Sequence, residues 1–176
     1  LEDLAKLNIK TKDTKLPYAS DFIKEQIELI KTLELKGFTY QTSDGVYFNI
    51  SKYKEYGKLG GLSQEFQARI SENAEKKNSR DFSLWKFYKD IGWESPWGRG
   101  FPGWHIECSA MIKALLGDEI DIHTGGIEHI PVHHNNEIAQ SENANGKPLA
   151  RFWLHRAHLQ IGGEKIAKSE GNVVYL

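Results

Sequence analysis

The segment from residue 123 to residue 142, HTGGIEHIPVHHNNEIAQSE, constrains the fold and the chemistry of this chain more than any other. It holds four of the seven histidines, two adjacent glycines, a proline and a polar helical pattern. Glycine permits tight turns and close approach of the backbone to a ligand, and proline interrupts regular structure. We therefore expect a strand, a turn at Gly125 and Gly126 and, after Pro131, a helix over 132–143.

The two halves of the chain show different patterns of helices and strands. The second half alternates the two, which is typical of an α/β fold with a largely parallel sheet. The first half predicts an amphipathic helix, an Asp-Gly hairpin, a second helix and an aromatic strand. In chain order, the further expected elements are a helix at 16–36, a hairpin at 38–50, a helix at 62–77, a strand at 82–88, a helix at 105–116, strands at 119–123 and 151–161, and a turn at 162–163.

The segment 92–104, GWESPWGRGFPGW, separates two regions of different composition. Its three tryptophans, two prolines and four glycines fit an irregular, rigid loop better than a helix or a regular strand. We therefore predict a domain boundary near this segment, with one domain at 1–94 and another at 95–176. A chain of 176 residues is long enough for a compact pair of this kind.

Cys108, His133 and Glu137 form a candidate metal site. His133 and Glu137 are four residues apart, so on a helix their side chains share a face. Thiolate, imidazole and carboxylate together suit tetrahedral zinc, and an open fourth position is typical of a zinc that handles substrate. Two alternatives stay open. His129 or His134 could replace His133, and a lone cysteine is usually a small buried hydrophobe.

The first candidate for nucleotide binding is the segment around the paired glycines. His123, Gly125 and Gly126 follow a predicted strand, where the backbone can come close to a flat or phosphorylated ligand. Glu128 offers a carboxylate to the hydroxyls of a ribose. The alternative is an ordinary turn.

The second candidate is the segment 162–169, GGEKIAKS. Lys165 and Lys168 are placed to neutralise charge that builds up on phosphates in a transition state. The alternative is a solvated basic loop.

Composition narrows the class of protein. A net charge of −1 gives no bulk basic excess that would indicate nucleic-acid binding. A single cysteine excludes an internal disulfide and favours a reducing, cytosolic setting. The sequence has no apolar run long enough to span a bilayer and no signal-peptide pattern, so we expect no membrane partner. Because the chain begins without methionine, we expect it to be a fragment of a longer polypeptide or a processed product.

Taken together, these motifs resemble the cysteinyl-tRNA synthetase family of class I aminoacyl-tRNA synthetases. FPGWHIECSAM at 101–111 is very close to the family signature PGWHIECSAM, and 121–142 resembles its DIHxGGxD…HHxNEIAQSE block. KIAKS at 165–169 is similar to the class I KMSKS loop, and 44–50 and 81–86 resemble the segments DGVYFDV and DFALWK. The resemblance covers most of the chain.

This resemblance implies a fold and a reaction. The fold would be α/β: the second half of a class I Rossmann-type (HUP-like) nucleotide-binding domain at 95–176, ending in a KMSKS-like loop, with an inserted α+β connective domain at 1–94. The reaction would be activation of cysteine by ATP, with Mg²⁺, to cysteinyl-adenylate and transfer to tRNA(Cys) in the cytoplasm. Catalysis of this kind rests on positioning and charge stabilisation.

The resemblance also implies roles for individual residues. One zinc ion would select cysteine by binding its thiolate, and Trp104 matches a tryptophan that packs near the substrate side chain. Lys168 matches the lysine that stabilises the pentavalent phosphorus, and Lys165 assists it. The positions that match three of the four zinc ligands are Cys108, His133 and Glu137, and those that match residues around adenosine are Gly126 and Glu128.

The chain departs from the family pattern in several places. The HIGH motif and the first zinc cysteine are absent, Ile166 and Ala167 replace Met and Ser of KMSKS, and Glu128 stands where Asp is common. We interpret the chain as an internal fragment that lacks the HIGH half and the anticodon-binding region and is inactive alone. The alternatives are the related cysteine ligase of mycothiol synthesis and a non-catalytic zinc- or RNA-binding module derived from a synthetase.

Overall fold

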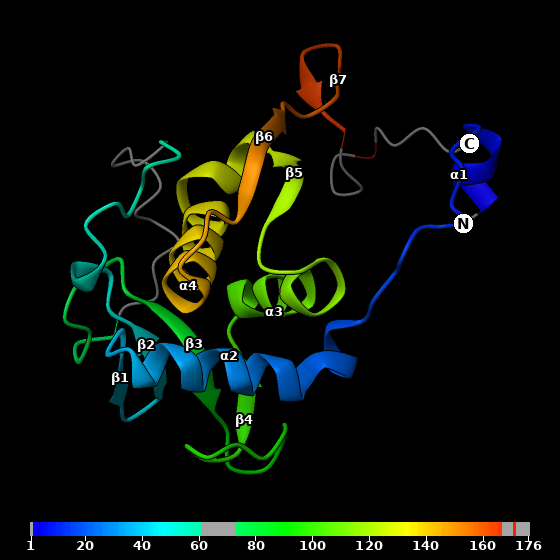
Figure 1. The fold of residues 1–176 in the computed structure, drawn as a ribbon. Helices are drawn as coiled ribbons and strands as arrows, with labels where there is room; N and C mark the ends of the chain where they lie inside the picture. Colours follow the sequence, from blue (N-terminus) through cyan, green and yellow to red (C-terminus); the bar gives the residue numbers. More distant parts are fainter. Residues whose placement is uncertain (1, 61–72, 167–170, 172–176) are drawn as a thin grey trace.

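The fold combines an antiparallel sheet, a parallel pair of strands and helices that pack against both (Figure 1). The computed structural model describes residues 2–60, 73–166 and 171. Within these ranges no helix is both long and apolar enough to cross a membrane.

The first half begins with helix α1 (Glu2–Lys6), a 3-10 turn η1 (Ala19–Phe22) and helix α2 (Ile23–Leu35). The helix predicted at 16–36 is therefore correct over most of its length but too long at its start. Pro17 disfavours helical backbone in the residue before it, and Tyr18 is extended, with φ −95° and ψ 132°. Gly37, with φ 77°, follows the end of α2, as is common after a helix.

The antiparallel sheet contains β1 (Thr39–Thr42), β2 (Gly45–Phe48), β3 (Phe82–Phe87) and β4 (Gly100–Pro102), and the 3-10 turn η2 (Ile50–Lys52) follows β2. The predicted hairpin at 38–50 and strand at 82–88 are confirmed. The segment 92–104 is more regular than predicted, because its residues 100–102 pair with β3. Gly100 allows this pairing, since a Cβ there would lie 1.9 Å from the carbonyl oxygen of Lys86.

The second half contains α3 (Trp104–Leu116), β5 (Ile120–Gly126), α4 (Asn135–Asn145) and β6 (Ala150–Arg156), with β5 and β6 paired in parallel. A 3-10 turn η4 (Ile127–His129) and a π-helical turn η5 (Ile130–His134) connect β5 to α4. The predicted alternation of helix and strand, with parallel pairing, is therefore confirmed. The strand predicted at 151–161 is divided: β6 ends at Arg156, and β7 (Gln160–Ile161) pairs with β8 (Glu164–Lys165) across the predicted turn at 162–163.

The turn predicted at Gly125 and Gly126 is wrong. Both glycines belong to β5 and pair with His155 and Arg156 of β6, and Gly126 is extended, with φ −77° and ψ 157°. Glycine is needed at these two positions because neighbouring side chains occupy the space that a Cβ would fill, and not because the backbone turns there. A Cβ on Gly125 would lie 2.5 Å from the ring of His134, so glycine lets an imidazole pack directly on the strand.

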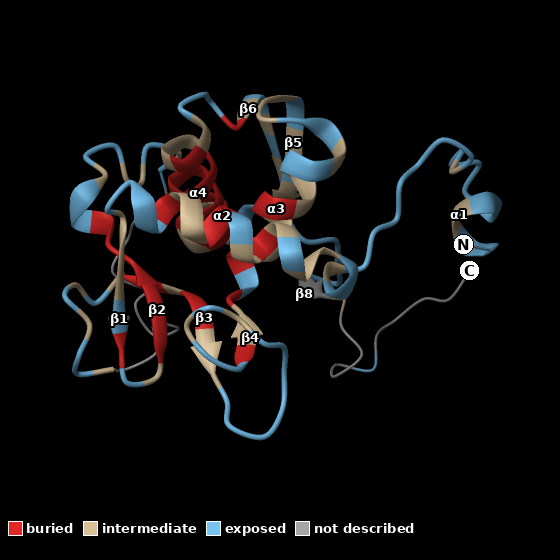
Figure 2. Cartoon of the chain, turned by 60° about the horizontal axis from the view of Figure 1, so that its bottom comes forward, coloured by how far each residue is buried: buried red, intermediate tan, exposed pale blue. Residues whose placement is uncertain are grey.

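The hydrophobic core lies between the antiparallel sheet and the helices. Figure 2 shows the buried residues gathered in β2, β3 and α4 and in the facing parts of α2 and α3. Burial of such apolar surface is the main favourable term in folding. Core members with almost no exposed surface are Ile30, Leu33, Phe48, Leu84, Trp85, Ile106 and Ala139.

The predicted domain boundary after residue 94 falls in the connection between β3 and β4. The antiparallel sheet takes three strands from 1–94 and one from 95–176, and α2 packs against α3. The two regions therefore share a sheet and a core, and the boundary itself stays a prediction. The helix predicted at 62–77 lies mostly outside the described residues, and its described end, 73–77, is not helical.

Candidate metal centre and nucleotide pocket

Helix α4 and the π-helical turn before it carry the polar residues of the candidate site. Pro131 lies at the start of η5. Proline supplies no backbone N–H to the helix, and single π-helical turns are frequent at functional sites. Burying polar side chains is costly unless they find partners, so this face is suited to specific interactions rather than to apolar packing. The buried polar residues of α4 are Asn135, Asn136, Glu137, Gln140 and Ser141.

Hydrogen bonds from other elements hold α4 in place. The hydroxyl of Tyr56 donates to Oδ1 of Asn136 at 2.6 Å. From α3, Oγ of Ser109 accepts a bond from Nε2 of Gln140 at 3.0 Å. Both halves of the chain therefore position the polar face of α4.

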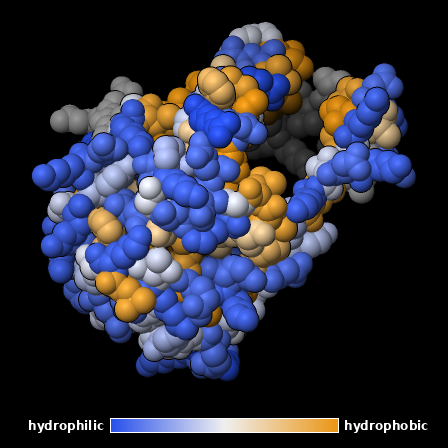
Figure 3. All heavy atoms as spheres, in the orientation of Figure 1, coloured by the Kyte–Doolittle hydropathy of each residue, from blue (hydrophilic) through white to orange (hydrophobic). Residues whose placement is uncertain are grey.

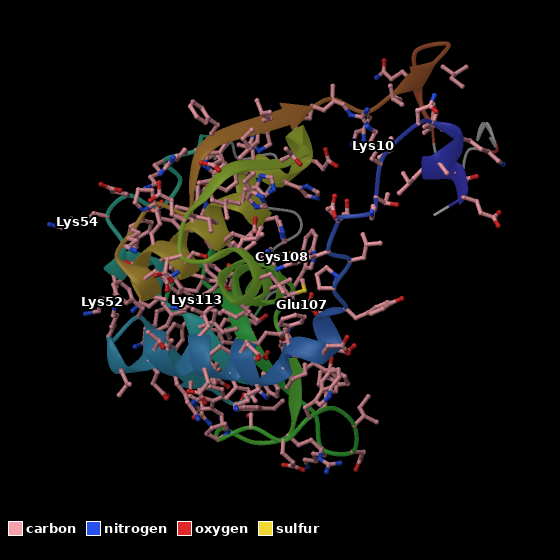
Figure 4. The ribbon with its side chains drawn as sticks, turned by 45° about the vertical axis from the view of Figure 1, so that its right-hand side comes forward. Lys10, Lys52, Lys54, Glu107, Cys108 and Lys113 are labelled. Atoms are coloured by element: carbon pink, nitrogen blue, oxygen red, sulfur yellow. The ribbon has the colours of Figure 1, made fainter. Side chains whose placement is uncertain are left out.

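Cys108 of α3 meets His133 of η5 and Glu137 of α4, as the sequence predicts. One ligand atom from each residue lies within 4.8 Å of the other two. Nε2 of His133 is 3.6 Å from Oε2 of Glu137. Figure 4 shows the sulfur of Cys108 on α3 beside its neighbour Glu107. The structure thus brings the three residues together, and their role as ligands stays a prediction.

Burial shifts the pKa of each of these groups in the direction that favours the neutral form of the group. Burial raises the pKa of the Cys108 thiol to about 12, and the charges of Glu137 and Glu107 add to the effect. Burial also raises the pKa of Glu137 and lowers the pKa of His133 to about 3. A divalent cation would reverse this preference for Cys108 and Glu137, because it stabilises thiolate and carboxylate. It would bind the imidazole of His133 in the neutral form that burial already favours.

The three donors fit zinc, which binds sulfur, nitrogen and oxygen in tetrahedral geometry. Glu137 is fully buried, and its Oε1 has no hydrogen-bond partner among residues 2–60 and 73–166. A buried carboxylate oxygen without a partner is costly, and a metal ion would satisfy it. Three protein donors leave one position for a further ligand.

Two further histidines hold the rings of His133 and His134. Nδ1 of His105 lies 2.9 Å from Nδ1 of His133, and Nε2 of His155 lies 2.7 Å from Nδ1 of His134. In each pair one nitrogen must donate and the other accept. Metal-binding histidines usually have their second nitrogen held in this way.

Sequence reasoning assigned neither His105 nor His155 to the site. His105 and Cys108 are three residues apart on α3 and so share a face, a signal that was available in the sequence. His155 reaches the site because it pairs with Gly125 in the register of the parallel strands. No local pattern in the sequence reveals that pairing.

Trp104, predicted to lie near the substrate, is the first residue of α3. Its ring centre is 4.5 Å from that of His133 and 5.2 Å from that of His105. More than half of the residue, 58%, is exposed. The indole therefore forms a solvent-facing wall beside the candidate metal cluster.

A pocket of about 730 Å³ lies at the carboxyl ends of β5 and β6. Gly125, Gly126 and Glu128, three of the residues predicted to bind ATP, line it together with Arg156 and His158. Nε2 of His158 is 3.3 Å from Oε2 of Glu128. Ligands of α/β proteins bind at the carboxyl ends of parallel strands, so the pocket is the candidate nucleotide site.

The other predicted residues are placed differently. His123 does not line this pocket. Its Nε2 lies 2.9 Å from Oε2 of Glu137, so the side chain faces the metal cluster. The backbone of Lys165 belongs to β8, next to Ile166, which lines the pocket. Lys168 lies outside the described residues.

Comparison with known proteins agrees with the resemblance seen in the motifs. Residues 1–176 match the family model described as tRNA synthetases class I (C) catalytic domain. The chain is 47% identical to the cysteine--tRNA ligase of Finegoldia magna, over 100% of the chain and 39% of that relative. It is 49% identical to the enzyme of that name from Listeria innocua, over 99% of the chain and 38% of that relative. It is 46% identical to the one from Thermococcus onnurineus, over 99% of the chain and 37% of that relative. The chain thus spans less than two fifths of these relatives, and it belongs to the class I (C) tRNA synthetase catalytic-domain family.

Proposed function

We propose that the protein containing this chain is a cysteine–tRNA ligase, which activates cysteine with ATP and transfers it to tRNA(Cys) in the cytoplasm. The observation that carries the proposal is the meeting of Cys108, His133 and Glu137 beside Trp104. The family supports it, because the relatives described above bear the name cysteine--tRNA ligase.

The cluster offers a physical basis for choosing cysteine over serine. When bound, zinc would supply a soft Lewis acid that holds a thiolate. Cys108, His133 and Glu137 would hold the ion together with the fourth zinc ligand that the resemblance implies, and zinc can expand its coordination to take the substrate sulfur as well. Serine has no easily formed thiolate, and a contact of this kind discriminates more strongly than a difference in side-chain size. Trp104 would pack against the substrate side chain, and His123, predicted in the ATP site, would orient Glu137 from β5.

The neighbouring pocket would bind ATP together with Mg²⁺. Gly125 and Gly126 expose backbone to the ligand, and Glu128 would accept hydrogen bonds from the ribose. Lys165 and Lys168 would stabilise the charge that develops on the phosphates during adenylate formation. The pocket takes residues from β5 and η4, and η5 and α4, which follow them directly in the chain, carry His133 and Glu137 of the metal cluster. The two substrates would therefore be held side by side.

We also propose that residues 95–176 form the second half of a Rossmann-type (HUP-like) domain and that 1–94 form its inserted connective domain. Ile122, Phe152 and Leu154 lie on one face of the parallel strand pair and are each more than half exposed. Figure 3 shows hydrophobic residues along β5 and β6. Parallel sheets are normally covered on both faces, so the bare face supports a larger domain in the whole protein.

The first test is exchange of pyrophosphate into ATP by the full-length protein. We expect exchange that requires cysteine and is negligible with serine, because only cysteine offers a thiolate to the cluster. Equal exchange with both amino acids would contradict the role given to Cys108, His133 and Glu137. Zinc binding without exchange by any amino acid would favour a non-catalytic module.

The second test concerns the lysine that follows the pocket. Lys168→Ala should slow adenylate formation more than it weakens cysteine binding, because the charge it stabilises is largest in the transition state. Lys147→Ala is the matched control, since Lys147 lies 3.7 Å from Asp118 in a surface ion pair away from the pocket. A loss confined to cysteine affinity would argue against the proposed role of Lys168.

A further inference from the structure

A second group of metal-binding side chains lies beside the Cys108 cluster. His123, His134 and Glu137 place one ligand atom each within 4.8 Å of the other two. Nε2 of His123 is 2.9 Å and Nε2 of His134 is 3.8 Å from Oε2 of Glu137. We propose that these three residues form an alternative position for a divalent transition-metal ion, which shares Glu137 with the Cys108 cluster. Two imidazoles and a carboxylate bind zinc and several other divalent metals.

The ring of His134 is held in the orientation that this position needs. Its Nδ1 is 2.7 Å from Nε2 of His155, which leaves Nε2 to face Glu137. Outer partners of this kind fix the ring and the tautomer of metal-binding histidines. Gly125 makes room for the ring, because a Cβ there would lie 2.5 Å from Cε1 of His134. Oε1 of Glu137 is buried and has no hydrogen-bond partner in the described part of the chain. A cation in this position would satisfy that oxygen, as one in the Cys108 cluster would.

The two positions hold one ion at a time. Oε2 of Glu137 is the carboxylate oxygen that lies within 4 Å of His123, of His133 and of His134, so both groups draw on the same donor. They differ in softness: the first contains sulfur, and the second contains only nitrogen and oxygen. Thiolates select soft metals, whereas imidazole and carboxylate accept a wider range of divalent ions. This inference does not depend on the proposed ligase activity.

The test uses cobalt(II) as a spectroscopic probe of the full-length protein. Wild-type protein should bind one cobalt and show a thiolate-to-cobalt charge-transfer band. Cys108→Ala should still bind one cobalt, more weakly and with a smaller charge-transfer band, because one thiolate has been removed. Adding His134→Ala to Cys108→Ala should weaken cobalt binding by at least about 10-fold, a loss seen even for outer partners of a metal site. His158→Gln in Cys108→Ala is the matched control, since it removes a histidine outside both groups.

A second variant protects the test against misfolding. His123→Ala in the Cys108→Ala protein removes a ligand from strand β5 rather than from η5, and it should cause the same loss as His134→Ala. The inference is overturned if Cys108→Ala binds cobalt no better than the double variant Cys108→Ala/Glu137→Gln, which also lacks the shared donor. It is also overturned if neither histidine variant weakens binding in the Cys108→Ala protein. In either case cysteine-dependent exchange by the wild type would be unaffected.

Discussion

The two sheets of this protein bury their side chains in opposite ways. In the antiparallel sheet, Phe48, Leu84 and Trp85 have no exposed surface and pack in the core with α2 and α3. In the parallel pair, one face exposes apolar side chains such as Phe152, and the other places His123 near the polar face of α4. The first sheet is stabilised by apolar burial, whereas the second is held by hydrogen bonds and supports the candidate site.

This difference separates stability from function within one chain. A well-packed core fixes its neighbours through close contacts. The helices α3 and α4 contribute residues to the core that the antiparallel sheet forms, so this core holds them in place. The candidate site on the other side of these helices is lined with imidazole, carboxylate and thiol groups, and burial of such groups is costly unless they have hydrogen-bond partners. Substitutions in the two regions should therefore affect different measurements.

The largest effect on stability should come from the core of the antiparallel sheet. Trp85→Ala should lower the free energy of unfolding by about 3–5 kcal/mol, through lost burial and the cavity left behind. Trp85 also donates from Nε1 to the carbonyl oxygen of Gly98 at 3.2 Å. Denaturant unfolding measures the change. Trp93→Ala, at the partly exposed margin of the sheet, should cost far less, and equal losses would show that the sheet is not the stabilising core.

Acid should weaken the site region next. Burial lowers the pKa of His105 from 6.5 to about 4. The unfolded chain then binds more protons than the folded chain between about pH 6.5 and about pH 4. The stability due to neutral His105 is complete above pH 6.5 and falls as the pH drops toward 4, by up to about 1.4 kcal/mol per pH unit. Unfolding of the metal-free chain across this range measures the slope.

His105→Asn is the control for this pH dependence, because it removes the titrating imidazole and should flatten the slope. His133 and His134, whose pKa values burial lowers to about 3, add slopes of the same sign. An equal slope in the wild type and in His105→Asn would contradict the buried, neutral state of His105. The sign of the total slope does not test this state, because burial raises the pKa of Glu137, and a raised carboxyl pKa adds a slope of the opposite sign.

The third prediction tests how the metal cluster is held. His105→Phe should lower zinc affinity by about 10–100-fold, because His133 loses the partner of its Nδ1. His105→Asn places a side-chain oxygen near the position of the lost nitrogen and should retain most of the affinity. Competition with a chelator measures both. If the two variants bind zinc alike, packing rather than the hydrogen bond positions His133.

Local patterns in the sequence account for most elements and for part of the site. Helical spacing placed His133 beside Glu137, and Asp44-Gly45 placed the first hairpin. The same reasoning misread Gly125 and Gly126 as a turn, because a glycine needed for space looks like a glycine needed for a turn. Pairing between distant strands brings His155 to His134, and its register depends on contacts that no local window contains.

The smallest effect should come from the exposed face of the parallel pair. Phe152 is 65% exposed, so Phe152→Ser should change the unfolding free energy of the 176-residue chain by no more than about 0.5 kcal/mol. Its neighbour Trp153 points to the other face, with its ring centre 4.7 Å from that of His123 and 5.0 Å from that of His134. Trp153→Ser should therefore cost clearly more. In the full-length protein, a large loss of unfolding free energy for Phe152→Ser would show that the rest of the polypeptide covers this face. A small loss in both the 176-residue chain and the full-length protein would show that the face stays exposed, and it would argue against the Rossmann-type half-domain.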